Sequence, residues 1–139
     1  MKMQIKETEL EKVWELRHKV MYPEKDIEYV KLADDENGIH LGFYTNNELV
    51  SVISLFIEKD SIQFRKFATL EDEQGKGYGT ILLNEVIDYA EKNDIKKIWC
   101  NSRIEKTGFY EKFGFTKTDK KYEKDGREFI IAEKILSVL

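Results

Sequence analysis

Cysteine, histidine and proline are scarce in this sequence. Its 139 residues include one cysteine, Cys100, two histidines, His18 and His40, and one proline. A single cysteine cannot form an internal disulfide, and one cysteine with two separated histidines argues against a zinc site. We therefore expect neither a disulfide nor a bound metal, and we expect both histidines to be structural.

Long apolar runs and a net positive charge are also absent. Residues 1–11 carry charges throughout, and no stretch approaches the length of a membrane span. The net charge is −4, and acidic residues are mixed among the lysines. Nucleic-acid binding favours clustered Lys and Arg, so this composition argues against such a partner. With 41% hydrophobic and 36% charged residues, we expect one globular cytoplasmic domain, residues 1–139, with no nucleic-acid or membrane partner.

Helical spacing is clear in three places. The first helix precedes Pro23, and Thr8 is placed to cap it with Glu11 three residues later; its apolar face is formed by Leu10, Val13, Leu16 and Val20. A longer helix is expected up to residue 92, and a shorter one at 106–113, where Gly114 provides a stop. The polar segment 24–38 predicts a short helix and a loop that could cover a site.

Runs rich in β-branched and aromatic residues predict the strands. They lie at 3–6, 39–44, 49–57, 61–69, 95–101, 115–123 and 128–135. Asn46 and Asn47 tolerate the positive φ of a tight turn, and Asp125-Gly126 is a strong two-residue turn signal, so both indicate hairpins. Hairpins at both ends with a strand-helix-strand unit between them suggest a mixed α+β sheet.

Residues 74–79, which read Gln-Gly-Lys-Gly-Tyr-Gly, follow one strand and open a helix. Backbone N–H groups at such a helix start favour an anion, and glycines allow a diphosphate to approach closely. The dinucleotide motif fails because Thr80 stands where its sixth-position glycine belongs, and the nucleoside-triphosphate motif lacks its Gly-Lys-Ser/Thr end. The alternative is a turn that only packs a strand against a helix.

This segment resembles the pyrophosphate motif of the GNAT N-acetyltransferase superfamily, Gln/Arg-x-x-Gly-x-Gly/Ala, with Gln74, Gly77 and Gly79 in matching places. Further segments are similar to the glyphosate N-acetyltransferase branch; they are residues 14–18, 39–42, 67–71, 99–103 and 108–115. The resemblance implies a mostly antiparallel sheet of about six to seven strands flanked by about four helices. It also implies that acetyl-CoA is the donor.

The resemblance places the coenzyme on one set of residues. These are Phe67, Ala68, Thr69, Gln74, Gly75, Lys76, Gly77, Tyr78, Gly79, Thr80 and Asn101. In the family, a backbone N–H of the fourth strand polarises the thioester carbonyl, which here implicates residues 67–69. Tyr110 holds the position of the family's general acid, which protonates the departing thiolate. Its alternative is an ordinary core position in an aromatic cluster.

The general base departs from the family pattern, because the strand at 61–69 contains no acidic residue. In the glyphosate branch a histidine of the last strand is the base, and the matching residue here is Glu128. Glu128 could accept a proton directly or through water if burial raised its pKa. Alternatively, it is a solvent-facing glutamate.

Three residues match substrate contacts of the glyphosate branch. Arg65 and Arg103 match arginines that bind anionic parts of the substrate, as a guanidinium fork suits a carboxylate or phosphonate. Their alternatives are a solvated strand arginine and an ion pair at a helix start. Tyr22 replaces a third arginine, which puts glyphosate itself in doubt as a substrate.

These residues predict an N-acetyltransferase that acts on a small, acidic amine acceptor by direct attack in a ternary complex. A non-catalytic acetyl-CoA sensor and a protein or peptide N-acetyltransferase are the alternatives. Cys100, on an expected central strand with no histidine placed to activate it, does not favour an acyl-cysteine route. A homodimer is possible, because an edge strand or the last hairpin could pair between subunits.

Overall fold

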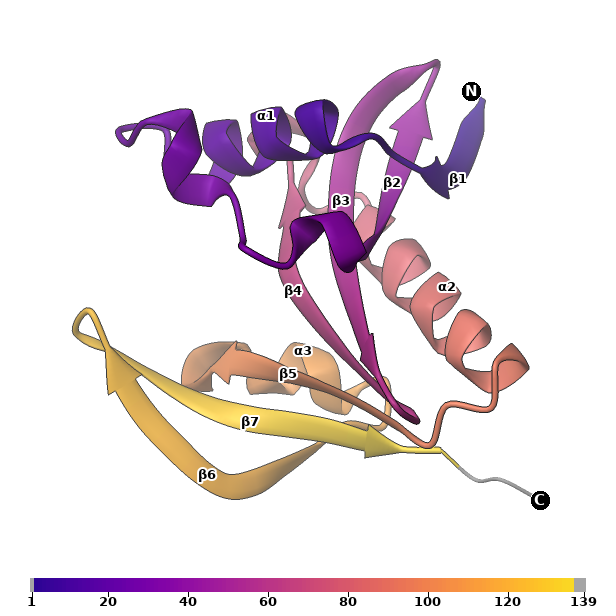
Figure 1. The fold of residues 1–139 in the computed structure, drawn as a ribbon, viewed down its shortest axis with the longest axis vertical. Helices are drawn as coiled ribbons and strands as arrows, with labels where there is room; N and C mark the ends of the chain where they lie inside the picture. Colours follow the sequence, from indigo (N-terminus) through magenta and orange to yellow (C-terminus); the bar gives the residue numbers. More distant parts are fainter. Residues whose placement is uncertain (1, 137–139) are drawn as a thin grey trace. The chain divides into compact units, whose positions relative to one another are not determined.

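The structure is a computed structural model that describes residues 2–136 (Figure 1). Within that range, hydrogen bonds place seven strands in the order β1-β2-β3-β4-β5-β7-β6, and three segments are α-helices. The chain forms two compact units. Unit 1 comprises Met1–Phe56 and Arg65–Val86, and unit 2 comprises Ile57–Phe64 and Ile87–Leu139.

Unit 1 begins with three antiparallel strands. β1 (Met3–Glu7) pairs with β2 (Ile39–Thr45), which in turn pairs with β3 (Glu48–Glu58). Asn46 and Asn47 join the last two strands with φ of 50° and 72°. Two consecutive positive φ values are typical of a type I′ hairpin turn, so the predicted hairpin is confirmed.

Helix α1 (Leu10–Met21) packs its apolar face into unit 1, where Val13 and Leu16 are buried together with Val52 and Ala68. The predicted cap by Thr8 is wrong, because the N-cap residue is Glu9 and it makes no side-chain cap bond. The Thr8 hydroxyl lies 2.9 Å from the Tyr44 hydroxyl and donates to the Lys6 carbonyl. A buried tertiary partner has therefore replaced the local cap.

Segment 22–38 contains two short 3-10 helices in place of the expected short helix. They are η1 (Ile27–Val30) and η2 (Asp35–Asn37). β4 (Ser61–Thr69) and α2 (Tyr78–Lys92) follow later in the chain, separated by the 3-10 helix η3 (Glu71–Glu73). Both β4 and α2 begin in one unit and end in the other.

Unit 2 contains the remaining strands. The start of β4 pairs in parallel with β5 (Lys97–Arg103), from Ser61 opposite Lys97 to Gln63 opposite Trp99. β5 pairs antiparallel with β7 (Arg127–Ile135), which pairs with β6 (Thr116–Lys124). Asp125 and Gly126 form the β6–β7 turn with φ of 53° and 75°, as their sequence predicted.

Two short helices connect β5 to β6 in unit 2. They are the 3-10 helix η4 (Ile104–Lys106) and the α-helix α3 (Thr107–Glu111). Gly114 follows with φ of 89°, the left-handed conformation expected of a helix stop.

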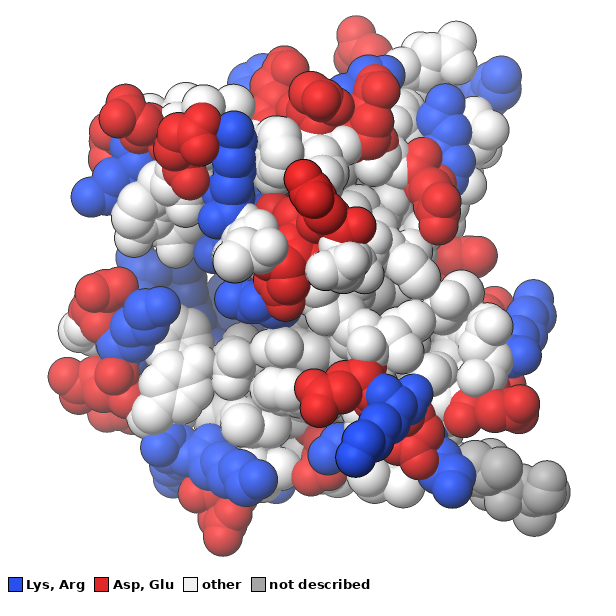
Figure 2. All heavy atoms as spheres, in the orientation of Figure 1, with Lys and Arg blue, Asp and Glu red and all other residues white. Residues whose placement is uncertain are grey.

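The α+β prediction is confirmed, with a seven-stranded, mostly antiparallel sheet. Three of the four expected helices are α-helices, and the fourth position is the 3-10 segment described above. No helix in residues 2–136 is long and apolar enough to cross a membrane. Figure 2 shows Lys and Arg interspersed with Asp and Glu over the visible face.

Candidate active site

The glycine segment between η3 and α2 combines left-handed backbone with open space. Gly75 and Gly77 have φ of 79° and 84°, and a Cβ built on either residue would meet no heavy atom within 4 Å. Glycine is required here by conformation, since L side chains rarely adopt such φ values. The open space in front of both residues, beside the first turn of a 15-residue helix, suits an anionic ligand.

Gly79 has a different role, which comes from packing. A Cβ at Gly79 would lie 3.3 Å from the Phe67 ring of β4. The missing side chain therefore allows the first turn of α2 to lie against β4. Tyr78 is buried beside it and stacks on Phe43, with ring centroids 4.6 Å apart.

Polar contacts hold the loop to its neighbours. The Gln74 side-chain amide donates to the Thr69 carbonyl at 3.0 Å, which ties the loop to the end of β4. Lys76 donates to Glu73 at 3.0 Å, and this hydrogen bond raises the pKa of Lys76. Lys76 is thus charged in the loop, where it can approach an anionic ligand.

β4 is irregular just before the residues predicted to hold the thioester. Lys66 has φ of 54° in the middle of the strand, which is typical of a β-bulge. Two residues later, the Ala68 carbonyl accepts a hydrogen bond from the Ser51 hydroxyl, which also lies 2.8 Å from the Thr69 hydroxyl. Such bulges often lie next to active sites, where they redirect backbone and side-chain groups.

Residues of segment 22–38 contact the charged side chains of β4. Arg65 lies 3.6 Å from the Asp34 carboxylate, and its guanidinium lies over the Phe56 ring. The Lys66 ammonium lies 5.3 Å from the centre of the Tyr22 ring. Consecutive strand residues normally face opposite sides. Here both contact residues of segment 22–38, and the left-handed φ of Lys66 interrupts the regular strand at this point.

A buried ion pair anchors segment 22–38 in unit 1. Arg17 of α1 and Asp35 of η2 are almost fully buried and form two hydrogen bonds of 2.8 and 2.9 Å. The same guanidinium donates to the Val30 carbonyl and to the Ser54 hydroxyl. Trp14 and the Leu32 backbone N–H complete the bonds to the Asp35 carboxylate.

The pKa of Asp35 results from two opposing effects, burial and hydrogen bonding to Arg17, Leu32 and Trp14. Burial alone would raise it, but hydrogen bonds from Arg17, the Leu32 N–H and Trp14, together with the Arg17 charge, lower it below its ordinary value. The carboxylate is therefore charged at neutral pH. His40 also belongs to the cluster, because its ring nitrogens bond the Ser54 hydroxyl and the Asp35 carbonyl.

In unit 2, Tyr110 of α3 lies in an aromatic cluster. Its ring lies between 5.2 and 5.9 Å from those of Phe64, Phe109 and Phe115. Burial, and secondarily the neighbouring Cys100, raises the pKa of Tyr110 well above its usual range. The phenol is therefore protonated at neutral pH. Its hydroxyl forms no hydrogen bond with another residue of the range 2–136, so its O–H donor is available.

Cys100 of β5 is 2% exposed, and burial raises the pKa of its thiol to about 12. The thiolate is the nucleophilic form of cysteine, so this side chain is unreactive at neutral pH. The geometry agrees with the sequence-based expectation of a small buried hydrophobe.

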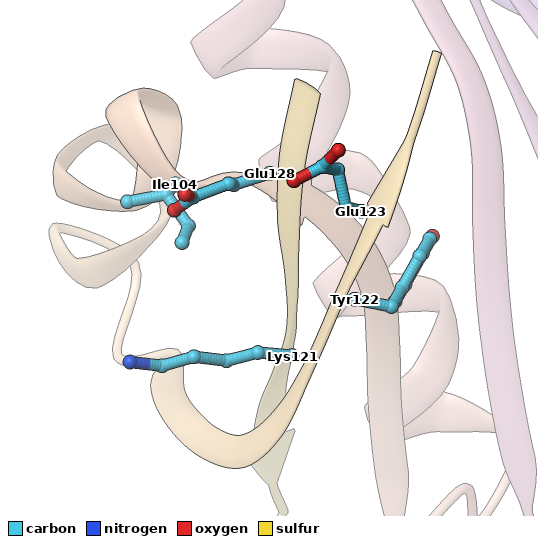
Figure 3. A pocket seen from close by; sticks show the side chains of 5 residues that line it. All are labelled: Ile104, Lys121, Tyr122, Glu123 and Glu128. Carbon is cyan, nitrogen blue, oxygen red and sulfur yellow. The ribbon is translucent and has the colours of Figure 1, made fainter. Parts of the chain in front are cut away.

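Glu128 lies at the exposed start of β7, beside a pocket of about 280 Å³ in unit 2 (Figure 3). The pocket is lined by Ile104, Lys121, Tyr122, Glu123 and Glu128. Glu123 stands directly opposite Glu128 in the β6–β7 ladder. Glu128 therefore lacks the burial that was expected of a direct proton acceptor.

Arg103 and Asn101 occupy the end of β5. Arg103 is partly buried, faces Phe129 in the ladder with β7, and makes no ion pair in the part of the chain that the structure describes. The ion pair considered as an alternative for Arg103 is thus absent there. Asn101 is exposed and lies opposite Ile131.

Comparison with known proteins identifies the family. The Acetyltransferase (GNAT) domain family matches residues 4–136. The chain belongs to the GNAT acetyltransferase family. It is 26% identical over 133 residues to the uncharacterized N-acetyltransferase YitI of Bacillus subtilis, and the match covers 89% of each chain.

Solved structures share the GNAT fold. An acyl-CoA N-acyltransferase from Pseudomonas aeruginosa superimposes with a TM-score of 0.81 at 17% identity, covering 96% of this chain and 98% of that one. A GNAT family acetyltransferase from Elizabethkingia anophelis, solved with acetyl-CoA bound, gives a TM-score of 0.74 at 21% identity and covers 96% and 98%. The prediction of an acetyl-CoA-dependent N-acetyltransferase is confirmed by the family.

The structure groups the predicted GNAT site residues by unit. Unit 1 holds the glycine loop, residues 67–69, Tyr22 and Arg65, whereas unit 2 holds Asn101, Arg103, Tyr110 and Glu128. No cluster of three or more His, Cys, Asp or Glu side chains that could hold a metal occurs in the described residues.

Sequence reasoning missed the Arg17–Asp35 pair, Asp34 and Lys66. Arg17 did leave a signal, since it stands four residues after Val13 and so falls on the apolar face of α1. A charge on a buried face indicates a buried partner. Nothing local could show that Asp35, rather than Asp34 or Glu36, would be that partner.

Proposed function

We propose that this GNAT acetyltransferase transfers the acetyl group of acetyl-CoA to the amine of a small acceptor that also carries an acidic group. The observation that carries the proposal is that the Arg65 side chain lacks a hydrogen-bond partner within residues 2–136. Its guanidinium forms no hydrogen bond with any described residue and contacts Asp34 only at 3.6 Å. The Arg103 side chain forms neither an ion pair nor a hydrogen bond with another described residue. Two such guanidinium groups can each bind a carboxylate or phosphonate through paired hydrogen bonds.

The donor is held, in this proposal, by the glycine loop. The open space before Gly75 and Gly77 and the N-terminus of α2 would receive the pyrophosphate, with Lys76 supplying a positive charge. An N–H of residues 67–69, next to the bulge at Lys66, would polarise the thioester carbonyl. Asn101 and Thr80 are further proposed coenzyme contacts.

In this proposal, two residues of unit 2 carry out the proton transfers. Tyr110 carries its proton at neutral pH and its hydroxyl forms no hydrogen bond with another described residue, so we propose that it protonates the coenzyme A thiolate as the C–S bond breaks. Burial raises its pKa, which by itself makes it a weaker acid, so the proposal rests on its position and not on that shift. Glu128 is exposed, so we propose that it receives the amine proton through water. Direct attack is proposed because Cys100, with its pKa near 12, is a poor acyl acceptor.

A thiol-release assay tests this function. The panel contains amino acids, aminophosphonates, polyamines and peptides, and we expect turnover with the acidic small amines. Arg65→Ala and Arg103→Ala should each raise KM for an acidic amine by about 10-fold, the order expected of a charged hydrogen bond. Equal effects on a neutral amine would argue against anion recognition.

The proposed proton acceptor has its own test. Glu128→Gln should alter the pH–rate profile, while Glu123→Gln removes a carboxylate from the facing strand and serves as the matched control. An unchanged profile for Glu128→Gln would leave water as the acceptor. Rapid thiol release with peptides alone would instead favour a peptide N-acetyltransferase.

A further inference from the structure

Asp34 and Arg65 form an exposed charge pair without a hydrogen bond. The Asp34 carboxylate lies 3.6 Å from the guanidinium, beyond hydrogen-bond distance, and the two side chains are 51% and 36% exposed. Neither side chain forms a hydrogen bond with another described residue. Arg65 therefore has free N–H donors and Asp34 has free acceptor oxygens, side by side.

Stability does not explain this pair. An exposed ion pair contributes about 0–1 kcal/mol, and one without a hydrogen bond lies at the low end of that range. A ligand would use the pair differently. A molecule that carries an ammonium and a carboxylate could donate to Asp34 and accept from Arg65 at the same time.

Asp34 is held in place through its neighbour. Asp35, the next residue, accepts hydrogen bonds from Arg17, Trp14 and the Leu32 N–H, and its own carbonyl bonds His40. The Asn37 N–H also donates to the Asp34 carbonyl. The backbone that carries Asp34 is thus fixed, which holds its exposed carboxylate within reach of Arg65.

Arg65 is positioned by packing rather than by hydrogen bonds. Its guanidinium lies over the Phe56 ring, 5.6 Å from the ring centre, in a cation–π contact. The next residue, Lys66, places its ammonium over the Tyr22 ring. The Asp34–Arg65 pair thus offers one cation and one carboxylate, which suits a ligand that carries one group of each sign.

We propose that Asp34 and Arg65 together recognise a zwitterionic acceptor, with Asp34 binding its ammonium and Arg65 its acidic group. Asp34 is then the residue that selects amino acids and aminophosphonates over amines or acids with one charged group. This inference rests on the proposed function, since it names the acceptor class for the same site.

The acceptor binds to Asp34 in its ammonium form and must lose two protons to become an amide. The ammonium loses one proton before its nitrogen attacks the acetyl carbon, and a second as the amide forms. The N–C bond forms and the C–S bond breaks. Tyr110 protonates the thiolate and regains one of these protons, and the other passes through water and Glu128 to solvent.

Equilibrium binding is the direct test. Glycine, glutamate and 2-aminoethylphosphonate would be titrated by calorimetry into the protein saturated with coenzyme A, a complex that cannot turn over. Asp34→Asn should weaken each dissociation constant by about 10-fold, as expected for losing one charged hydrogen bond. Arg65→Gln should weaken binding by a similar factor. The dissociation constant of the double variant should rise by less than the product of the two single-variant factors, because both groups hold one ligand.

Matched ligands and a matched variant make the test specific. Aminoacetonitrile, whose amine is neutral near pH 7, should bind equally to wild type and Asp34→Asn. Asp60→Asn removes the acid of a comparable exposed pair, Lys96–Asp60 at 3.7 Å, and should leave all dissociation constants unchanged.

Three results would overturn the inference. Tighter amino-acid binding in Asp34→Asn would mean that Asp34 only competes for Arg65, and unchanged binding would mean that it does not touch the acceptor. Absence of zwitterion binding to wild type would also reject it. The proposed function is judged separately by thiol release, so Asp34-dependent binding without acetylation would reject the function and keep the inference.

Discussion

The two units hold their buried functional side chains by different means. In unit 1, the Arg17–Asp35 cluster is charged and nearly saturated with hydrogen bonds, although the Arg17 Nε has no partner within residues 2–136. In unit 2, Tyr110 is held by aromatic rings, and its hydroxyl makes no hydrogen bond in the described part of the chain. The first arrangement fixes a loop by directional bonds, whereas the second fixes a ring and leaves its proton available.

The largest effect is expected from breaking the buried pair. Asp35→Ala leaves the Arg17 charge buried without its partner, which should lower the free energy of unfolding by about 3–5 kcal/mol in denaturant titrations. Asp34→Ala, one residue earlier but exposed, is the control and should cost at most about 0.5 kcal/mol. Similar losses in both variants would show that the pair does not hold unit 1 together.

Acid titration is a second test of how much the Arg17–Asp35 pair contributes to stability. The pKa of Asp35 in the folded protein lies below its ordinary value of 3.8. Its contribution to stability is therefore fully present above about pH 4 and is lost as pH falls through the folded pKa. Asp35→Asn should have a flatter loss of stability below pH 4 than wild type. An equally steep loss would assign the acid sensitivity to other carboxylates.

Removing the Tyr110 hydroxyl should have the next largest effect, on turnover rather than on folding. Tyr110→Phe keeps the ring that packs on Phe64, Phe109 and Phe115, but removes the proton donor. We expect kcat to fall by about 100-fold, with little change in acetyl-CoA affinity. Phe109→Leu is the packing control. If the Tyr110→Phe variant turned over at the wild-type rate, Tyr110 would not be the proton donor.

The glycine loop should show a smaller effect. Gly77→Ala forces an L side chain into φ of 84°, which should cost about 1–2 kcal/mol of folding stability and place a methyl group where the ligand would approach. Coenzyme A binding, measured by calorimetry, should weaken. Gly108→Ala also meets no atom within 4 Å but has no such φ, so it should be neutral. Unchanged coenzyme binding in Gly77→Ala would contradict the phosphate-loop assignment.

Cys100 should be the least sensitive position. Because burial raises its pKa to about 12, wild-type protein should react slowly with iodoacetamide at pH 8. Cys100→Ala should retain turnover with each acceptor. Loss of turnover, or trapping of an acetylated Cys100 by mass spectrometry, would revive the acyl-cysteine route.

Local patterns in the sequence predicted most of the elements. The Asn46-Asn47 and Asp125-Gly126 turns and the strand from Ser61 to Thr69 were predicted as observed, because φ preference and alternation act within a few residues. The cap of α1 was not, because the hydroxyl of Thr8 found a partner, Tyr44, that lies far away in the sequence. The number of domains stays a prediction.

By itself, the sequence determined the α+β class and the glycine turns, since periodicity, turn chemistry and positive-φ requirements are local properties, and its resemblance to the GNAT pyrophosphate motif indicated the family that the comparison then showed. Only the tertiary structure decided that Gly79 serves packing against Phe67 while Gly75 and Gly77 serve conformation. It alone selected Asp35 as the buried acid and left Asp34 exposed beside Arg65. Burial and ion pairing join residues that are distant in the chain, so no local pattern could predict them.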